Sequence, residues 1–316
     1  MKLQTIESAL AAMMSLIMTL AAGEAGMSGL ASGAAPVIGT VMAKGSFRLD
    51  NATVTGNATL FEGATIETKD ARSRMELSSG ARVSLGAESK ARFYGDRMIL
   101  EKGEGKLEKA DGFHFEARGL TIQPETGSAS ARVVMGNGTR VEVAALSGSF
   151  RVLNARGLLV ANLTSGRALA LEPQAVETAS KLTGTLRVVS GHYLLTDETT
   201  NVTAELAGAG LSKEVGSRIE VTGAMDPTAT PVTDASQFIQ VSAVKHLGKG
   251  SAGGSGAAAA GKGGAAAGSA AGGSTGVGIG TGATIAIIGG VAAAATLGGL
   301  AAAGKLPGQG SSSVSR

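Results

Sequence analysis

Residues 61–89 read FEGATIETKDARSRMELSSGARVSLGAES, and this stretch decides how the rest of the chain is interpreted. Apolar and polar residues alternate along it between glycine-bearing breaks such as the one at Gly80. Alternation with a period of two is typical of strands that bury one face, and glycine between such runs is typical of tight turns. The stretch therefore predicts short, half-buried β-strands joined by turns.

Part of this pattern recurs 58 residues later in the chain. The shift superposes Arg74, Gly80, Arg82 and Ser89 on Arg132, Gly138, Arg140 and Ser147. Each half then contains a strand, a glycine turn and a second strand. In the second half the turn is Asn137-Gly138, a strong hairpin signal because both residues accept a positive φ. We therefore expect two equivalent hairpins.

Further short strands are expected throughout this first region, and no segment of it has a helical period. Their expected ranges are 41–49, 91–94, 98–102, 105–109, 113–117, 121–124, 151–155, 158–163 and 168–171. Regular short strands of this kind predict an all-β fold. Both a β-sandwich and a short solenoid-like stack fit the pattern.

The region resembles FecR-like periplasmic domains. Their core has a Gly-x-x-Ile-x-Thr strand, a small-x-Arg-Ala-x-Leu strand and a Gly-x-Arg-Val-x-Leu strand, and the counterparts here are residues 63–68, 71–77 and 80–85. The resemblance covers residues 36–175. It implies a β-rich module of the cell envelope.

Four arginines of the repeat, Arg74, Arg82, Arg132 and Arg140, form a candidate partner surface that could bind anions. The alternative is a solvated strand face, since charged residues at alternate positions of half-buried strands normally face water and keep sheet edges soluble. The resemblance implies no catalytic role for these positions.

Residues 181–247 predict a second β-domain. Five strands follow one another closely there, with a helix or turn at 210–215 between the third and the fourth, which fits a small OB-like barrel. The segments 191–197 and 215–223 resemble small bacterial envelope OB modules. Tyr193 is a candidate contact residue, but barrels that bind single strands stack several aromatics on a basic groove. Tyr193 and Phe238 are therefore expected to fill the barrel, and the loop 226–236 is the better contact surface.

The N-terminal residues 1–35 read as a signal peptide and leader, because Lys2 precedes a short uncharged apolar run that ends in small residues. The alternative is an amphipathic or buried N-terminal helix.

The C-terminal region has three expected parts. Residues 248–276 are almost wholly Gly, Ala and Ser, which predicts a flexible linker. Residues 277–304 carry no charge and predict a transmembrane helix, with the positive charges of the short tail 305–316 in the cytoplasm. Small residues at every fourth position of that helix would favour helix-mediated self-association. The alternative is a loosely ordered apolar tail.

Charge and composition exclude several functions. The sequence has no Cys, which excludes disulfides and thiolate metal sites. Residues 36–247 contain 23 basic and 23 acidic residues, and a neutral domain is a poor candidate for nucleic-acid binding. His114, His192 and His246 are far apart and lack the spacing of metal ligands. No cofactor, metal or catalytic site is predicted.

The expected function is a non-enzymatic, exported binding or scaffolding protein of the cell envelope. We expect it to lie in the periplasm or another extracytoplasmic space, anchored in the inner membrane by the C-terminal helix, with an envelope protein or glycan as partner. One alternative is an anti-sigma-type regulator in iron-siderophore uptake signalling, although the chain has no Trp-containing inner segment and no N-terminal cytoplasmic domain is expected. Another is a glycan- or peptidoglycan-associated binding module.

Overall fold

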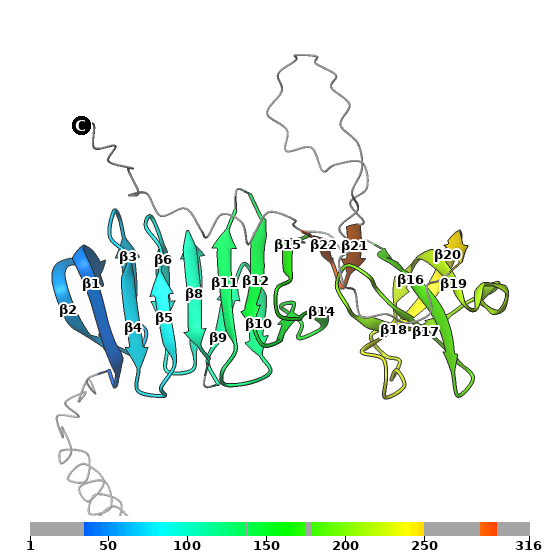
Figure 1. Cartoon of the computed structure of the whole chain (residues 1–316), viewed down its shortest axis with the longest axis horizontal. Helices are drawn as coiled ribbons and strands as arrows, with labels where there is room; N and C mark the ends of the chain where they lie inside the picture. The colour runs from blue at the N-terminus through cyan, green and yellow to red at the C-terminus, as the bar shows by residue number, and fades with distance from the viewer. Residues whose placement is uncertain (1–34, 111, 137, 175–178, 250–284, 296–316) are drawn as a thin grey trace, which may run out of the picture. The chain divides into compact units, whose positions relative to one another are not determined.

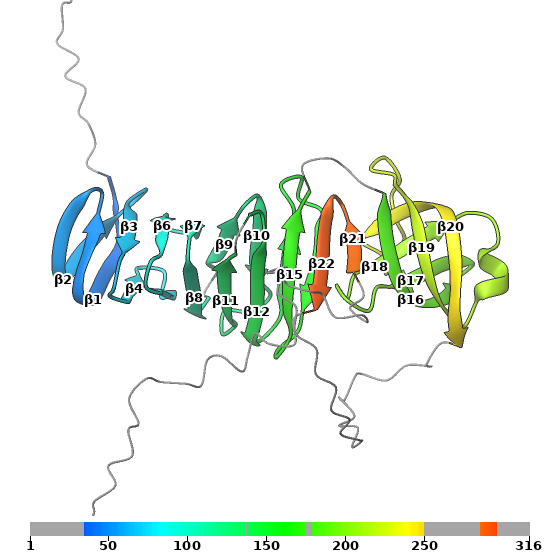
Figure 2. The ribbon, with the colours of Figure 1, turned by 90° about the horizontal axis from the view of Figure 1, so that it is seen from above.

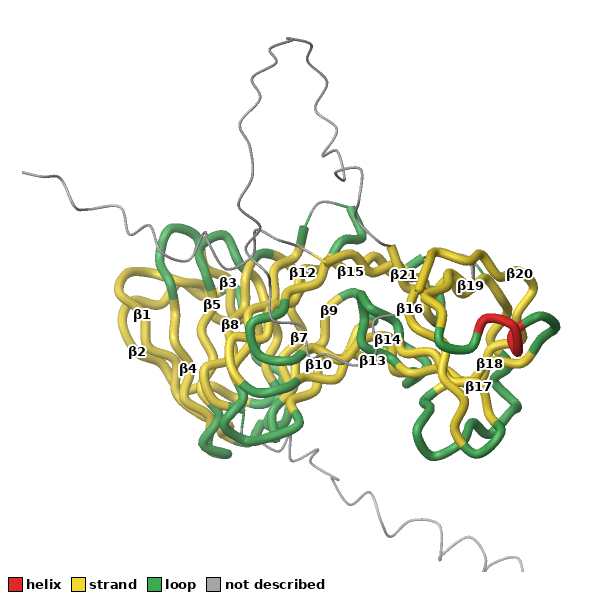
Figure 3. The backbone as a smooth tube through the Cα atoms, turned by 45° about the vertical axis from the view of Figure 1, so that its right-hand side comes forward, coloured by secondary structure: helices red, strands yellow, loops and turns green. Residues whose placement is uncertain are grey.

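The computed structural model describes residues 35–110, 112–136, 138–174, 179–249 and 285–295. The chain divides into two units between Ala35 and Pro36, and all the described secondary structure belongs to the second. The described residues are mostly β-structure, as the alternation predicts, and their one helical segment is the 3-10 helix η1 (Leu211–Glu214) (Figure 3). The expected signal peptide lies outside the described residues.

The first β-domain contains fifteen of the described strands (Figure 1). All but β2 lie at or close to the positions that the sequence predicts, and β2 was not predicted. They are β1 (Val37–Leu49), β2 (Ala52–Phe61), β3 (Thr65–Thr68), β4 (Ser73–Leu77), β5 (Arg82–Leu85), β6 (Lys90–Phe93), β7 (Arg97–Lys102), β8 (Glu104–Lys109), β9 (His114–Ala117), β10 (Leu120–Pro124), β11 (Ser130–Met135), β12 (Val141–Ser147), β13 (Phe150–Leu153), β14 (Leu159–Leu163) and β15 (Ala168–Pro173).

These strands pair into two sheets, which we call the first and second sheets. The first has the order β1, β4, β5, β8, β11, β12, β15. The second has the order β1, β3, β6, β7, β9, β10, β13, β14. All these pairings are antiparallel except the parallel pair β7–β9. Because the chain passes from one sheet to the other after every one or two strands, the domain is a two-sheet sandwich wound like a short solenoid.

Strand β1 belongs to both sheets. Its residues 39–43 pair with β4, whereas residues 47–49 pair with β3. The bend between them falls at a register shift after Met42, where Gly45 has a φ of 125°. Strand β2 follows β1 along its whole length, so the β1–β2 hairpin closes one end of both sheets.

The core of the first domain lies between the two sheets. Alternate residues of each short strand are buried, as in β4, where Ser73, Met75 and Leu77 are buried and the residues between them are exposed. Four phenylalanines are among the largest fully buried side chains, namely Phe93, Phe113, Phe115 and Phe150. Each of them removes more apolar surface from water than a small residue such as alanine can, and this burial stabilises the sandwich.

The predicted repeat is present. The β4–β5 and β11–β12 hairpins both lie in the first sheet, on either side of β8. Gly80 and Gly138 occupy the two turns with φ angles of 88° and 64°, which L-residues with side chains rarely adopt. The 58-residue shift therefore relates two hairpins of one sheet, as expected.

The second domain is a closed five-stranded barrel, which confirms the predicted strand plan. Its strands are β16 (Ser180–Val189), β17 (His192–Thr196), β18 (Thr203–Ala207), β19 (Ser217–Met225) and β20 (Gln237–Lys249). They pair in the order β16, β17, β18, β20, β19 and back to β16, with β18 and β20 parallel. Helix η1 lies between the third and fourth strands, as expected.

The C-terminal helix prediction is wrong for its described part. Residues 285–295 form a β-hairpin of β21 (Ile285–Ile288) and β22 (Val291–Ala295). Strand β22 pairs with β15, and β21 meets β16 at the pair Ile287 and Lys181 (Figure 2). Gly289 and Gly290 form the turn with φ angles of 55° and 77°. By pairing with β15, the backbone of β22 obtains hydrogen-bond partners. Apolar side chains of the hairpin such as Ile288 and Val291 are buried in the core of the protein.

This hairpin also changes the expected boundaries. Strand β20 extends to Lys249, so the barrel includes the first two residues of the expected linker. Residues 250–284 and 296–316 lie outside the described residues. Among those that the structure describes, no helix is long and apolar enough to cross a membrane.

Side chains and backbone also join the barrel to the end of the first domain. The Nδ2 and backbone NH of Asn162 donate to the carbonyls of Asn201 and Thr200 at 3.1 and 2.7 Å. Arg167 donates to the carbonyls of Glu198 and Thr199 at 3.2 Å. The edge strand β14 is thus covered by the barrel.

Candidate functional site

The four arginines predicted as a partner surface all lie on the outward face of the first sheet. Arg74 and Arg132 belong to β4 and β11, Arg82 begins β5, and Arg140 precedes β12 directly. Each of them is followed by a buried residue of the core. The strand period therefore places these side chains toward solvent, which is where the sequence predicted them.

Glutamates neutralise three of the four. Arg74 pairs with Glu108 at 3.0 Å, and Arg140 pairs with Glu142 at 2.9 Å. Arg132 binds both carboxylate oxygens of Glu104, at 2.7 and 2.8 Å. This hydrogen bonding to Glu104 raises the pKa of Arg132 above its ordinary value. Arg82 is exposed and makes no ion pair with any residue that the structure describes.

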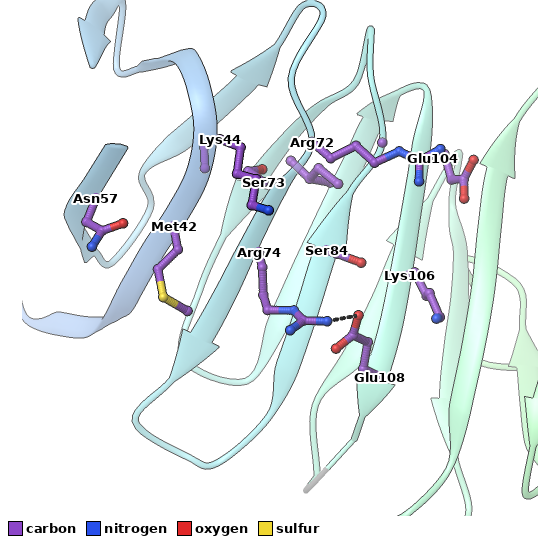
Figure 4. Close-up of a pocket in the computed structure, with 13 residues that line it drawn as sticks. Met42, Lys44, Asn57, Arg72, Ser73, Arg74, Ser84, Glu104, Lys106 and Glu108 are labelled. Atoms are coloured by element: carbon purple, nitrogen blue, oxygen red, sulfur yellow. Dashed lines mark hydrogen bonds and ion pairs between the residues drawn. The ribbon is translucent and has the colours of Figure 1, made fainter. Parts of the chain in front are cut away.

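A groove of about 550 Å³ crosses β1, β4, β5 and β8 on this outward face, and we call it the sheet groove (Figure 4). Three small residues lie along it, namely Ala43 of β1, Ser84 of β5 and Gly86, which follows β5. Longer polar and charged side chains surround them, namely Lys44, Asn57, Arg72, Arg74, Glu104, Lys106 and Glu108. The groove thus has four cationic and two anionic side chains.

Three of these cations have no anionic partner among the described residues. Arg74 is held by Glu108, and Glu104 is committed to Arg132, which leaves Lys44, Arg72 and Lys106 unpaired. Lys44 and Arg72 are exposed and Lys106 is half-buried. The sheet groove therefore carries a net positive charge.

Strand register brings two cations directly opposite each other. Lys106 faces Ser84 on one side and Arg132 on the other, and Ser84 in turn faces Arg74. Like charges opposite each other on neighbouring strands destabilise a sheet by up to about 1 kcal/mol. At a strand spacing of about 4.8 Å, Arg74 and Arg132 lie on either side of Lys106 within roughly 14 Å. Since Glu108 and Glu104 already pair with Arg74 and Arg132, Lys106 is the cation of this row that is left to bind an anion.

A second cavity, of about 430 Å³, differs in its charge pairing. Of its cations, Arg48 pairs with Glu67 at 3.8 Å, Lys102 with Glu88 at 3.4 Å, and Lys90 with Glu101 at 2.8 Å. Most of its positive charge is neutralised, so the sheet groove is the stronger candidate.

Tyr193 lies on β17 of the barrel and not beside the arginines. It is half-buried and packs against the hydrophobic core, as the packing interpretation expected, and Phe238 of β20 is half-buried as well. The structure therefore does not bring Tyr193 and the four arginines together into one site.

The loop 226–236 is held against the barrel by Glu205. Its carboxylate accepts the backbone NH of Val232 at 2.9 Å and lies 2.7 Å from Nδ1 of His192. Burial alone would raise the pKa of Glu205, but these two bonds prevail and lower it. His114, His192 and His246 lie on three strands, as predicted, each beside a glutamate.

A second buried carboxylate, Asp197, organises the turn between β17 and β18. It accepts the backbone NH groups of Thr183, Thr199 and Thr200 at 2.8, 3.0 and 2.8 Å, and the Thr200 hydroxyl at 2.9 Å. Burial outweighs these bonds and raises the pKa of Asp197. Its partners are all donors of the barrel itself, so its role is structural.

Sequence reasoning found Arg74 but missed Lys44, Arg72 and Lys106. Arg72 precedes β4, and Lys44 and Lys106 lie within β1 and β8, at positions where lysine and arginine are ordinary surface residues. Only the strand register shows that they surround one groove. The ion pairs show that Glu104 and Glu108 of this groove already bind Arg132 and Arg74.

Comparison with known proteins adds little. No family model matches the chain, and no curated protein matches it. It is similar to two crystal structures described as a "putative anti-sigma factor" from Parabacteroides distasonis ATCC 8503. The first is 16% identical with a TM-score of 0.30 and covers 36% of this chain and 57% of that one. The second is 15% identical with a TM-score of 0.30 and covers 36% and 56%. A TM-score of this size supports no conclusion about function.

Proposed function

We propose that this chain is a non-enzymatic binding protein of the cell envelope and that its sheet groove holds an anionic glycan. The observation that supports the proposal most directly is a set of three cations around one open groove, Lys44, Arg72 and Lys106, which have no anionic partner in the part of the chain that the structure describes. Carboxylate or phosphate groups of a ligand would pair with them and offset their mutual repulsion.

The form of the groove favours an extended chain over a compact ligand. It runs across four strands and is open to solvent, so it can follow several units of a polymer. Asn57 and Ser84 add an amide and a hydroxyl that can bond to sugar hydroxyls. The β-sheet beneath fixes the backbone positions from which these side chains extend, which reduces the entropy cost of binding.

The location is part of the proposal. Residues 1–35 have the pattern of an export signal, and an exported domain would meet acidic envelope glycans directly. Fractionation of cells that produce the full chain tests this. We expect the protein outside the cytoplasm, and recovery of the whole chain in the cytoplasmic fraction would contradict the location.

Isothermal titration of the full chain with polygalacturonate, which carries carboxylates, and with teichoic acid, which carries phosphates, tests the ligand. Neutral dextran serves as the control polymer. We expect at least one polyanion to bind and dextran not to bind. Two outcomes would contradict the glycan proposal, namely binding of dextran with equal affinity and binding of none of the three.

Single substitutions locate the site. Lys106→Gln and Arg72→Gln should each weaken polyanion binding about tenfold, which corresponds to roughly 1.4 kcal/mol. Lys213→Gln removes the same charge from the exposed 3-10 helix of the barrel and should leave the affinity unchanged. Equal losses in all three variants would show a nonspecific effect of net charge and would remove the groove from the proposal.

A protein partner is the competing outcome, and the anti-sigma alternative belongs to it. Affinity capture on the immobilised full chain, with the Lys106→Gln variant as the control bait, would reveal it. Capture of a sigma factor by both baits, together with no polyanion binding, would replace the glycan proposal by the regulator function.

A further inference from the structure

The outer edge of β2 is open. Among the strands that the structure describes, β2 pairs with β1 alone. The backbone NH and C=O groups on its other side therefore face no neighbouring strand of the described chain. Such an edge is a template for a further strand.

Strand β2 lacks the usual protection of an edge. Its ten residues, ATVTGNATLF, contain no charged residue and no proline. Natural edge strands are generally blocked by lysine, other charges, proline or bulges. The bend of β1 between Met42 and Ser46 lies opposite Gly56 of β2, which has a φ of 84°. It interrupts the regular pairing of β2 once, and residues 57–61 beyond it form an unprotected edge segment.

Exposed apolar side chains gather at the same edge. Val37, Met42 and Phe61 are 56%, 37% and 41% exposed, and all three belong to the β1–β2 hairpin. Val37 and Phe61 face each other in the strand register. Val37 and Phe61 thus form an exposed apolar pair beside the open edge, and exposed apolar groups of this kind are typical of an interaction surface.

The opposite end of the first sheet is already occupied. There β22 pairs with β15, and β21 continues to β16 of the barrel. Any extension of the first sheet by another chain therefore has to begin at β2.

We propose that two copies of this chain pair through residues 57–61 of β2, antiparallel about a two-fold axis near Thr59. The neutrality of β2 selects this partner. In a two-fold contact the same surface patch meets itself, so a charged edge strand would bring like charges together. Here Thr59 would meet Thr59, Ala58 would meet Leu60, and Asn57 would meet Phe61 of the second copy, so no like charges come together.

Such a pair would have two grooves on one face. A two-fold axis perpendicular to a continuous sheet keeps the outward faces of both copies on the same side. Asn57 lines the sheet groove, so the two grooves would begin on either side of the shared edge. A polymer that spans both would bind with avidity. This consequence depends on the proposed glycan function, whereas the pairing itself does not.

A cysteine reporter tests the pairing in the full chain, which has no Cys of its own. Thr59→Cys should form a disulfide-linked dimer under mild oxidation, because the two residues meet at the axis. Thr164→Cys, at an exposed turn of the first domain, should remain mostly unlinked. Equal crosslinking of the two variants would overturn the proposal.

Sedimentation analysis of the unmodified chain between about 5 and 200 µM gives a second readout, with circular dichroism as the test of folding. We expect a monomer–dimer equilibrium whose dissociation constant rises at least tenfold in Thr59→Lys, while Thr164→Lys leaves it unchanged. A monomer at all concentrations would overturn the pairing. Affinity for a short acidic oligosaccharide, which fits one groove, should not fall in Thr59→Lys, because this variant removes none of the cations of the groove, so the two proposals can fail separately.

Discussion

The side-chain amide of Asn154 donates a hydrogen bond of 2.8 Å to the carbonyl of Gly289, a residue 135 positions later in the chain. The Oδ1 of the same residue accepts the backbone NH groups of Arg156 and Leu158, both at 3.0 Å. One buried side chain therefore shapes the turn before β14 and holds the turn of the C-terminal hairpin. This bond shows that the hairpin belongs to the folded domain.

Replacing Asn154 by alanine should destabilise the protein by about 1–3 kcal/mol, because a buried carbonyl and two backbone NH groups lose their partner. Urea denaturation of the full chain measures this. Gln123→Ala removes an exposed amide from β10 and should change the stability by less than about 0.5 kcal/mol. Equal stability of the two variants would contradict the anchoring role.

Substitution of two neighbouring isoleucines tests whether residues 285–288 form a strand or part of a helix. Ile288 is fully buried, whereas Ile287 is half-buried on the opposite side of β21. Ile288→Ala should cost about 2–4 kcal/mol and Ile287→Ala clearly less. Thermal or urea unfolding measures both variants. A loss for Ile287→Ala as large as that for Ile288→Ala would argue against the strand.

Two buried carboxylates of the barrel should respond to acid in opposite ways. The pKa of Asp197 is raised from its ordinary value of 3.8, so the folded state binds this proton first. The contribution of Asp197 to stability therefore rises as the pH falls from above its folded pKa toward 3.8. Asp197→Asn should remove this gain, measured by urea unfolding at a series of pH values from 7 to 4.

The pKa of Glu205 is lowered from its ordinary value of 4.5, so its effect on stability changes with pH in the opposite direction to that of Asp197. Its ionised form stabilises the fold above pH 4.5, and this contribution is lost as the pH falls through the folded pKa. Glu205→Gln should reduce the loss of stability in acid, and the same urea titration checks it. An identical pH dependence in the wild type and both variants would show that neither group is shifted.

Salt should weaken ligand binding in the sheet groove. Raising the ionic strength from 0.1 to 1 M shortens the screening length from about 10 to about 3 Å. Since Lys44 and Arg72 are exposed, we expect the affinity for a polyanion to fall at least tenfold in a calorimetric titration. A salt-independent affinity would mean that the unpaired cations do not bind the ligand.

Most of the strands could be predicted because their signals are local. In β4 the buried and exposed residues alternate one by one, and Gly80 marks the turn that follows. The 58-residue repeat and the five-strand order of the barrel depend on the same signals. Residue composition near each strand was enough for these predictions.

The C-terminal segment shows where this reasoning fails. An uncharged run rich in alanine satisfies the length criterion for a membrane helix, and its sequence contains no information on an open strand edge elsewhere. Residues 291–295 have a strand to pair with only after β15 has formed. The candidate site is similar, because Arg74 could be chosen from the repeat but Lys106 could not.

From the residue order alone follow the β-class, the five-strand plan of the barrel and the outward position of the arginines, since each depends on neighbours within a few residues. Tertiary structure decided the conformation of residues 285–295, and it decided that β2 and Lys106 have no further strand and no anionic partner among the described residues. Each of these depends on which strands become neighbours across long stretches of chain, and hydrogen bonds and ion pairs form only between groups that folding brings together.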